Sequence, residues 1–323
     1  MILTVTLNPL LEHRLFFNSV ELGSSNRNSR EIYCAGGKGI NVSRQLNKLG
    51  IQNSAFTFLG GNNGKSLRHC LINDKIDFSV VSSKSETRIA EVVIEESKKR
   101  VTTFFGKNSY ISTGESDEFK GKLEKMIQNC SIVVFMGSSP CKETDDIFPF
   151  GIELANKHDK ISILDTYGNH LQNCIDASPT VIHNNIDEIR SSLGFTLNDE
   201  VEKLEFLRNM YSKNIKMAFL TDGPNPVYAG KFDFHYKIIP AAIDTYDPTG
   251  SGDAFVAGIA HGLEEAIVFN EFVKSATALG MLNASQLETC SVSPELINNL
   301  LDKIEVLPVG KKMKVINDTP NYQ

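Results

Sequence analysis

The feature that most constrains the fold is an alternation of short apolar runs with amphipathic segments from about residue 116 onward. Each apolar run ends in polar residues or glycine, and the segment after it carries apolar residues at helical spacing. Strands that alternate with helices indicate a mostly parallel sheet, covered by helices on both faces. Ligands of such sheets bind beyond the carboxyl ends of the strands. We expect strands at 132–136, 161–164, 180–182 and 217–220, and helices near 116–128, 143–157, 186–193, 199–212, 268–285 and 293–303.

The first third of the chain predicts a second, smaller sheet. Residues 88–95 and 100–105 are β-rich runs around a polar turn, which is the pattern of a hairpin. Residues 13–34 carry no helical period but several short polar and apolar alternations, which indicate exposed strands. We expect the hairpin to pair with these strands.

Composition and charge exclude several classes of function. The net charge of −6 argues against a nucleic-acid partner, which favours a basic face. The six cysteines are scattered without a CxxC pair, which is typical of reduced thiols, and the seven histidines form no metal-binding spacing. No signal peptide and no apolar run long enough to cross a membrane is evident, so we expect a cytoplasmic protein without a membrane partner.

The turn at 247–255, Asp-Pro-Thr-Gly-Ser-Gly-Asp-Ala-Phe, opens a predicted helix with apolar residues at helical spacing. The amides of Gly250, Ser251 and Gly252 can converge on an anion there, because a helix start presents unpaired N–H groups. Asp253 would repel a bound phosphate unless it takes a proton from an incoming hydroxyl. The turn alone is equally consistent with Asp253 as an ordinary first-turn residue that caps the helix.

A second glycine turn, Gly-Gly-Lys-Gly-Ile-Asn at 36–41, also precedes a predicted helix. It can form a substrate loop in which Gly37 lets the backbone approach a ligand, Lys38 supplies a cation and Asn41 binds a hydroxyl. A helix start with a solvated lysine is the simpler interpretation. The spacing matches neither a Walker A loop nor a GxGxxG turn.

Three further positions have both a structural and a functional interpretation. Arg88 can grip a phosphate or lie on the surface of the hairpin. Asn185 and Glu188 fit a helix capping box, or a carboxylate that organises water around magnesium. Thr221 and Gly223 form a strand-end turn that is either ordinary or able to hold a nucleotide.

Both glycine turns together resemble the two signatures of the ribokinase-like (PfkB) carbohydrate kinases. Thr-Leu-Asn-Pro at 6–9 and Thr87-Arg88 are similar to the branch of 1-phosphofructokinase and tagatose-6-phosphate kinase, and residues 278–284 resemble the tagatose side. The resemblance extends to about residue 305. It implies a ribokinase-like α/β fold in one domain over residues 1–310, with a discontinuous β lid from about 13–34 and 88–106. We expect residues 311–323 to be a polar C-terminal tail.

The resemblance also assigns roles to matching positions. Asp253 would be the base, and Gly250, Ser251 and Gly252 would form the anion hole. The nucleotide, ATP, would lie by Thr221, Gly223 and Asn283, with Asn185 and Glu188 near its phosphates and Mg²⁺ held by Glu188 through water. The sugar would face Glu12, Gly37, Lys38 and Asn41, and Arg88 with Lys38 and Arg27 would hold its phosphate. Closure of the lid would exclude water, and relatives that dimerise through it suggest a homodimer.

Several positions depart from the pattern of the family. Glu12 stands where an aspartate usually binds sugar hydroxyls, and His183-Asn184 stands where Lys-Pro is usual. Pro226 replaces a glycine, Tyr167 a small residue, and the run 102–105 lacks a glutamate. We therefore expect an ATP-dependent kinase of a ketohexose phosphate, tagatose 6-phosphate or fructose 1-phosphate. The alternatives are a kinase of an unphosphorylated sugar and a catalytically silent sugar-phosphate-binding protein.

Overall fold

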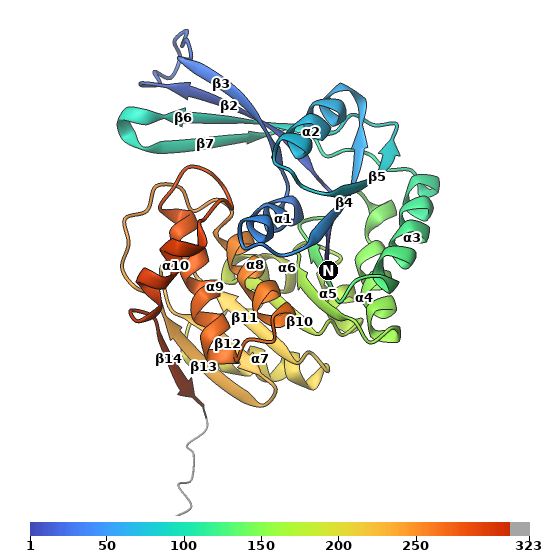
Figure 1. Ribbon diagram of the computed structural model, residues 1–323, viewed down its shortest axis with the longest axis vertical. Helices are drawn as coiled ribbons and strands as arrows, with labels where there is room; N and C mark the ends of the chain where they lie inside the picture. The colour runs from blue at the N-terminus through green and yellow to red at the C-terminus, as the bar shows by residue number, and fades with distance from the viewer. Residues whose placement is uncertain (311–323) are drawn as a thin grey trace, which may run out of the picture.

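A ten-stranded sheet forms the centre of the computed structural model, which describes residues 1–310 (Figure 1). Its strands, in chain order, are β1 (Ile2–Thr6), β4 (Asn53–Gly60), β5 (Phe78–Ser83), β8 (Ile132–Met136), β9 (Ile161–Asp165), β10 (Val181–Asn185), β11 (Met217–Thr221), β12 (Val227–Lys231), β13 (Phe234–Ile239) and β14 (Glu305–Val309). Their spatial order is β14-β13-β12-β11-β10-β9-β8-β1-β4-β5. The strands from β5 to β11 run parallel, and β12, β13 and β14 add an antiparallel edge. The predicted mostly parallel sheet is confirmed.

Helices cover both faces of this sheet, as the alternation predicted. They are α1 (Lys38–Lys48), α2 (Gly61–Asn73), α3 (Thr113–Gln128), α4 (Ile147–Lys157), α5 (Leu171–Asp176), α6 (Ile186–Leu193), α7 (Glu200–Ser212), α8 (Ser251–Glu264), α9 (Phe269–Ala284) and α10 (Pro294–Leu301). Side chains of α3 to α7 contribute to one hydrophobic core. Side chains of α1 and of α8 to α10 contribute to a second core.

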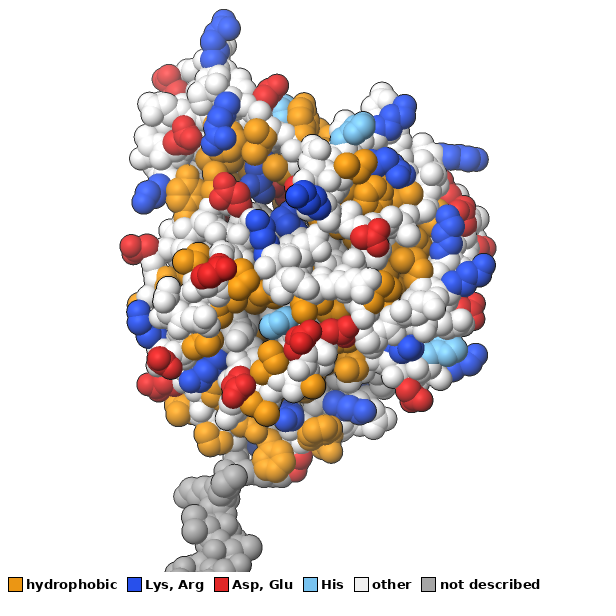
Figure 2. Space-filling view, viewed as in Figure 1, with side chains coloured by type: hydrophobic (Ala, Val, Ile, Leu, Met, Phe, Trp, Pro, Cys, Tyr) orange, Lys and Arg blue, Asp and Glu red, His pale blue; other side chains and the backbone are white. Residues whose placement is uncertain are grey.

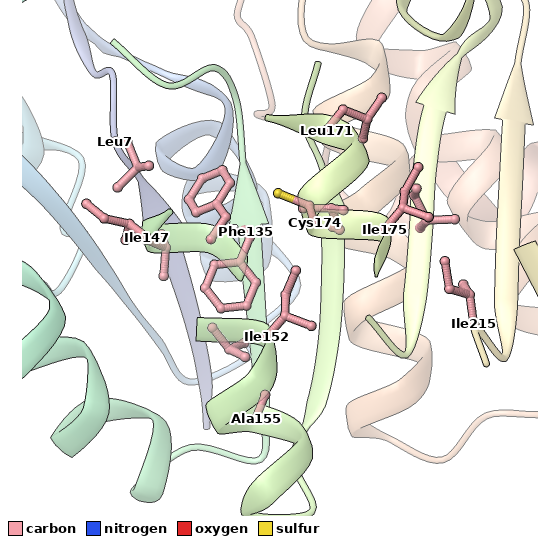
Figure 3. Packing of buried hydrophobic residues seen from close by; sticks show 14 of the residues in the cluster. Leu7, Phe135, Ile147, Ile152, Ala155, Leu171, Cys174, Ile175 and Ile215 are labelled. Carbon is pink, nitrogen blue, oxygen red and sulfur yellow. The ribbon is translucent and has the colours of Figure 1, made fainter. Parts of the chain in front are cut away.

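The strands supply both cores because successive side chains point to opposite faces. In β8, Val133 and Phe135 join the core beneath α3 to α7, whereas Ile132 and Val134 join the core beneath α1, α8 and α9. Figure 3 shows Phe135 beside Ile152 of α4. This two-sided burial is why the parallel strands read as continuous apolar runs in the sequence.

A separate four-stranded sheet projects from the body of the molecule (Figure 1). Its strands are β2 (Leu10–Phe17), β3 (Arg30–Gly36), β6 (Arg88–Glu95) and β7 (Arg100–Phe105), in the order β3-β2-β6-β7. The predicted pairing of the hairpin with the earlier strands is confirmed, since β2 pairs in parallel with β6. We call this unit the small sheet. The predicted C-terminal tail, 311–323, lies outside the described residues, and the assignment of residues 1–310 to one domain stays a prediction.

Helix α8 lies unusually close to α9. A side chain at Gly258 would place its Cβ 2.5 Å from Cα of Ala276, and one at Gly262 would come within 2.2 Å of Cβ of Phe272. Only glycine permits this approach, so the sequence of α8 fixes the position of its first turn, which carries Asp253. Within residues 1–310, no helix is long and apolar enough to cross a membrane.

Candidate active site

Asp253 lies in the first turn of α8 and is 5% exposed. One of its oxygens, Oδ2, accepts a hydrogen bond of 2.8 Å from the side-chain amide of Asn41 on α1. Burial is the main cause that raises the pKa of Asp253 to about 7, with Asp165 and Glu188 acting in the same direction and Lys38 and Asn41 opposing. The side chain of Asp253 accepts no capping hydrogen bond at this helix start, where the N-cap residue is Gly250. The carboxyl group is therefore poised to exchange a proton near neutral pH.

The turn before Asp253 depends on glycine. Gly250 has a φ of 79°, and a Cβ there would meet Cγ2 of Thr289 at 2.2 Å. Of the three amides predicted to form an anion hole, that of Ser251 donates to the carbonyl of Pro248 at 3.1 Å. This amide is thus engaged in the turn itself, which leaves Gly250 and Gly252 as the candidate anion-binding donors.

Asn283 of α9 holds this turn in place. Its side-chain amide donates to the carbonyl of Thr249 at 2.8 Å, and its oxygen accepts from the backbone of Cys290 at 2.7 Å. The residue is 1% exposed. Its side chain is thus used to position this turn, and the expectation that Asn283 lies beside the nucleotide stays a prediction.

Lys38 begins α1 and lies between two carboxylates. Its ammonium donates to Asp165 and to Glu188, both at 2.7 Å. Burial alone would lower the pKa of Lys38, but the two carboxylates raise it above its ordinary value. Lys38 is therefore not the unpaired cation that the sequence suggested for the substrate phosphate.

Asp165 is the member of this cluster that the sequence analysis missed as a site residue. It ends β9, is fully buried, and accepts from Nδ1 of His183 at 2.7 Å. Burial opposes ionisation, but Lys38 and His183 together hold its pKa at about 2. Its position at the carboxyl end of a parallel strand was the signal that could have identified it.

His183 connects this cluster to the end of β11. Its Nε2 lies 3.2 Å from Oγ1 of Thr221, and its ring packs against Phe255 of α8. Thr221 thus lies at the carboxyl end of β11 beside this cluster. Its contact with the nucleotide stays a prediction. Gly223 follows Thr221 in an exposed turn with a φ of 54°.

Asn185 and Glu188 form a complete capping box at the start of α6. Each side chain accepts from the backbone N–H of the other, at 2.8 Å for Asn185 and 3.1 Å for Glu188. The structural interpretation is therefore correct. It does not exclude the functional one, because the second oxygen of Glu188 faces Lys38.

The small sheet contributes Glu12 and Arg88. Oε2 of Glu12 accepts from Nε and Nη2 of Arg14, at 2.8 and 2.6 Å. The other oxygen lies against Gly36, where a Cβ would stand 2.8 Å from it. Glu12 thus reaches the glycine loop, and Arg14 already neutralises its charge. Its contact with the sugar stays a prediction.

Arg88 folds over the end of β1. It donates to the carbonyl of Asn8 at 2.9 Å and to the side chain of Asn108 at 3.3 Å. Among the described residues, its buried Nε and the buried Oδ1 of Asn8 have no hydrogen-bond partner. Figure 2 shows Lys and Arg side chains at the hollow where the small sheet meets the body.

Two predicted substrate residues differ in their placement. Gly37 is the N-cap of α1 with a φ of 128°, so the loop needs glycine there, and its contact with the sugar stays a prediction. Arg27 lies in the exposed loop between β2 and β3. Because Arg88 pairs with Leu10 and Glu95 with Phe17, this loop is at the opposite end of the small sheet. Seven residues of strand span roughly 23 Å, so Arg27 cannot help Arg88 within one chain.

Comparisons with known proteins show the family to which the chain belongs. The sequence pattern of the pfkB family carbohydrate kinases matches residues 12–296. The chain belongs to this family. Its resemblance to carbohydrate kinases is thereby confirmed, and the chain is a carbohydrate kinase.

Individual relatives cover nearly the whole chain. The tagatose-6-phosphate kinase of Staphylococcus epidermidis is 31% identical over 312 residues, which are 96% of this chain and 100% of that protein. The tetrameric inhibited form of phosphofructokinase-2 from Escherichia coli matches with a TM-score of 0.85 and 20% identity, over 94% of this chain and 98% of that one. A possible 1-phosphofructokinase from Thermotoga maritima matches with a TM-score of 0.84 and 23% identity, over 96% and 99%. The two structures establish the shared fold.

Proposed function

We propose that this kinase transfers the γ-phosphoryl group of ATP to a hydroxyl group of a ketohexose phosphate and so forms the bisphosphate. The activity would be of the tagatose-6-phosphate kinase or 1-phosphofructokinase type. The observation that carries the proposal is Asp253, a buried carboxyl group at a glycine-rich helix start whose pKa is raised to about 7. The 31% identity to a tagatose-6-phosphate kinase supports the class of substrate.

The proposed step uses few groups. The carboxylate of Asp253 accepts the proton of the sugar hydroxyl as its oxygen forms a bond to the γ-phosphorus. The bond from this phosphorus to the oxygen that bridges the β- and γ-phosphates breaks, and that oxygen leaves on ADP. The amides of Gly250 and Gly252 would stabilise the charge that develops on the transferred group.

The residues present are suited to a magnesium ion that is bound mainly through water. Within residues 1–310, no group of three His, Cys, Asp or Glu side chains could hold a metal directly. Magnesium in kinases usually keeps several waters and binds one or two carboxylates together with substrate phosphates. Glu188 would hold the ion through water, and the bound ion would neutralise phosphate charge.

We further propose that Arg88 holds the phosphate already present on the sugar. Among residues 1–310, its Nε is a buried donor without a partner, so it can donate to a phosphate oxygen without losing another hydrogen bond. Oδ1 of Asn8, a buried acceptor without a partner, can accept from a hydroxyl group of the sugar instead. Closure of the small sheet over this place would exclude water, and the same sheet is the proposed contact of a homodimer.

The test is release of ADP over a panel of tagatose 6-phosphate, fructose 1-phosphate, fructose 6-phosphate and the free sugars, with Mg²⁺ present. We expect one ketohexose phosphate to give the highest kcat/KM and the free sugars to be poor substrates. Free sugars that react as well as their phosphates would make the chain a kinase of unphosphorylated sugars. Binding of a sugar phosphate without any ADP would support a silent binding protein instead.

A further inference from the structure

Arg44, on the second turn of α1, contacts Asn41 one turn earlier on the same helix. Its Nη1 donates to Oδ1 of Asn41 at 2.8 Å, and Nδ2 of Asn41 donates to Asp253 at 2.8 Å. Asn41 is 6% exposed. The three side chains therefore form one hydrogen-bonded chain that ends on the proposed base.

We propose that Arg44 is a positioning residue for the reaction, because it fixes the side-chain amide of Asn41 with the NH2 group toward Asp253. This inference rests on the proposed role of Asp253. A guanidinium has only donors, so it must face the oxygen of the amide. The nitrogen of the amide then faces the carboxylate, which accepts from it.

Arg44 is itself held rigidly. Its Nε and Nη2 donate to one oxygen of Asp74, the residue after α2, at 3.0 and 2.9 Å. Nη2 also donates to the carbonyl of Ala35 at 2.5 Å, next to the glycine loop. The guanidinium cannot turn away without losing these bonds, so Asn41 has no alternative orientation that keeps its own two partners.

The orientation matters because the two ends of an amide favour opposite states of the base. The NH2 end donates to a carboxylate and favours the ionised, proton-accepting form. The oxygen end accepts from a carboxylic acid and favours the protonated, inactive form. Without Arg44, Asn41 is free to flip, and Asp253 would hold its proton to higher pH.

Other charged or titratable groups surround Asp253, so the effect must be separated from theirs. Lys38 favours ionisation of Asp253, whereas Asp165 and Glu188 oppose it. The thiol of Cys290 also interacts with Asp253, and the ring of His183 lies under the neighbouring Gly252. Arg44 reaches Asp253 through Asn41, and a double substitution isolates that path.

The experiment measures the pH profile of kcat/KM for the full chain with Arg44→Met, Asn41→Leu and both. We expect each single substitution to move the acidic limb upward by about one pH unit, which is a tenfold loss at a fixed pH on that limb. The double substitution should show no further shift. Equal shifts that add in the double variant, or no shift with Arg44→Met, would overturn the inference.

Two further variants guard against a merely structural effect. Arg44→Lys keeps a donor for Asn41, so the acidic limb of its pH profile should return at least halfway to its position in the unchanged chain. Lys48→Met, on the exposed side of α1, should leave the position of this limb unchanged. A loss of folding with Arg44→Met would be seen in its melting temperature, and Arg44→Lys would then decide between the outcomes. A limb that stays shifted by the full amount with Arg44→Lys, although the variant folds, would contradict the inference.

A readout without turnover separates this inference from the proposed function. The carboxyl carbon of Asp253 can be titrated by carbon-13 NMR, with Asp253→Asn to identify its signal. We expect a midpoint near pH 7 in the unchanged chain and a higher one with Arg44→Met. A shifted midpoint in a chain that phosphorylates no sugar would refute the proposed function alone, whereas an unshifted midpoint in an active enzyme would refute the role of Arg44 alone.

Discussion

The ammonium of Lys38 lies 2.7 Å from the carboxylate of Asp165, a side chain that solvent does not reach. The same ammonium lies 2.7 Å from Glu188, so α1, β9 and α6 meet at one cation. Removing a partner from a buried ion pair leaves a charge without compensation. Lys38 is thus expected to matter more for the structure of the site than for direct contact with a phosphate.

Replacing Lys38 by methionine should destabilise the protein by about 3 kcal/mol at pH 7, because Asp165 loses its main counter-charge. The folded pKa of Asp165, about 2, is below its ordinary value, so its contribution is present above pH 4 and is lost as pH falls toward 2. Urea unfolding at pH 7 and pH 3 measures this difference, which should shrink at pH 3. Lys48→Met is the control, and an equal loss in both variants would contradict the prediction.

Asp253→Asn should stabilise the protein in alkaline solution. The folded pKa of Asp253 is raised to about 7, so the folded state holds the proton more tightly and stability falls as pH rises from about 4 to 7. The amide carries no such cost. At pH 8, we expect the free energy of unfolding of the variant to exceed that of the unchanged chain by a few kcal/mol, on the order given by the pKa shift of Asp253. At pH 4 the two should be equal. Asp117→Asn, on the exposed side of α3, should show no such pH dependence.

Gly250→Ala should impair both folding and activity. The left-handed backbone costs an L-residue about 1–2 kcal/mol, and the contact with Thr289 adds to this cost because Asn283 pins the turn. Melting temperature and kcat measure the two effects. Gly121→Ala, in open space within α3, should instead raise stability slightly. A Gly250→Ala protein as stable and active as the unchanged chain would show that the turn tolerates rearrangement.

The strands in the middle of the sheet could be predicted because they are buried on both faces and are therefore continuous apolar runs in the sequence. The edge strands escaped prediction for the opposite reason. In β5 and β14 most side chains are exposed or half-buried, so neither shows a continuous apolar run. Helix α2 begins at Gly61, within a glycine- and asparagine-rich stretch whose composition is typical of a turn.

The sequence indicated which turns and strand ends lie together at the candidate site. The partners of each side chain were not, because they come from residues distant in the sequence. Lys38 is paired by Asp165 and Glu188, and Asn283 turns inward to Cys290. Arg27 was misplaced because membership of the small sheet says nothing about which end of a strand a loop occupies.

Arg88→Met should raise KM for the sugar phosphate by about 10- to 100-fold, the value of one or two hydrogen bonds to a charged group. KM for ATP and turnover of free sugar should change little. Steady-state kinetics with both acceptors test this, with Arg68→Met of the exposed face of α2 as control. A rise in KM for ATP of the same size would place Arg88 at the nucleotide instead.

The most direct test of Asp253 as the base is kcat of the Asp253→Asn protein on the best sugar phosphate, measured as ADP release at saturating ATP. We predict a fall of about 10²- to 10⁴-fold, the usual contribution of a general base, with both KM values changed by no more than a few-fold. Turnover retained within tenfold of the unchanged chain would contradict the assignment.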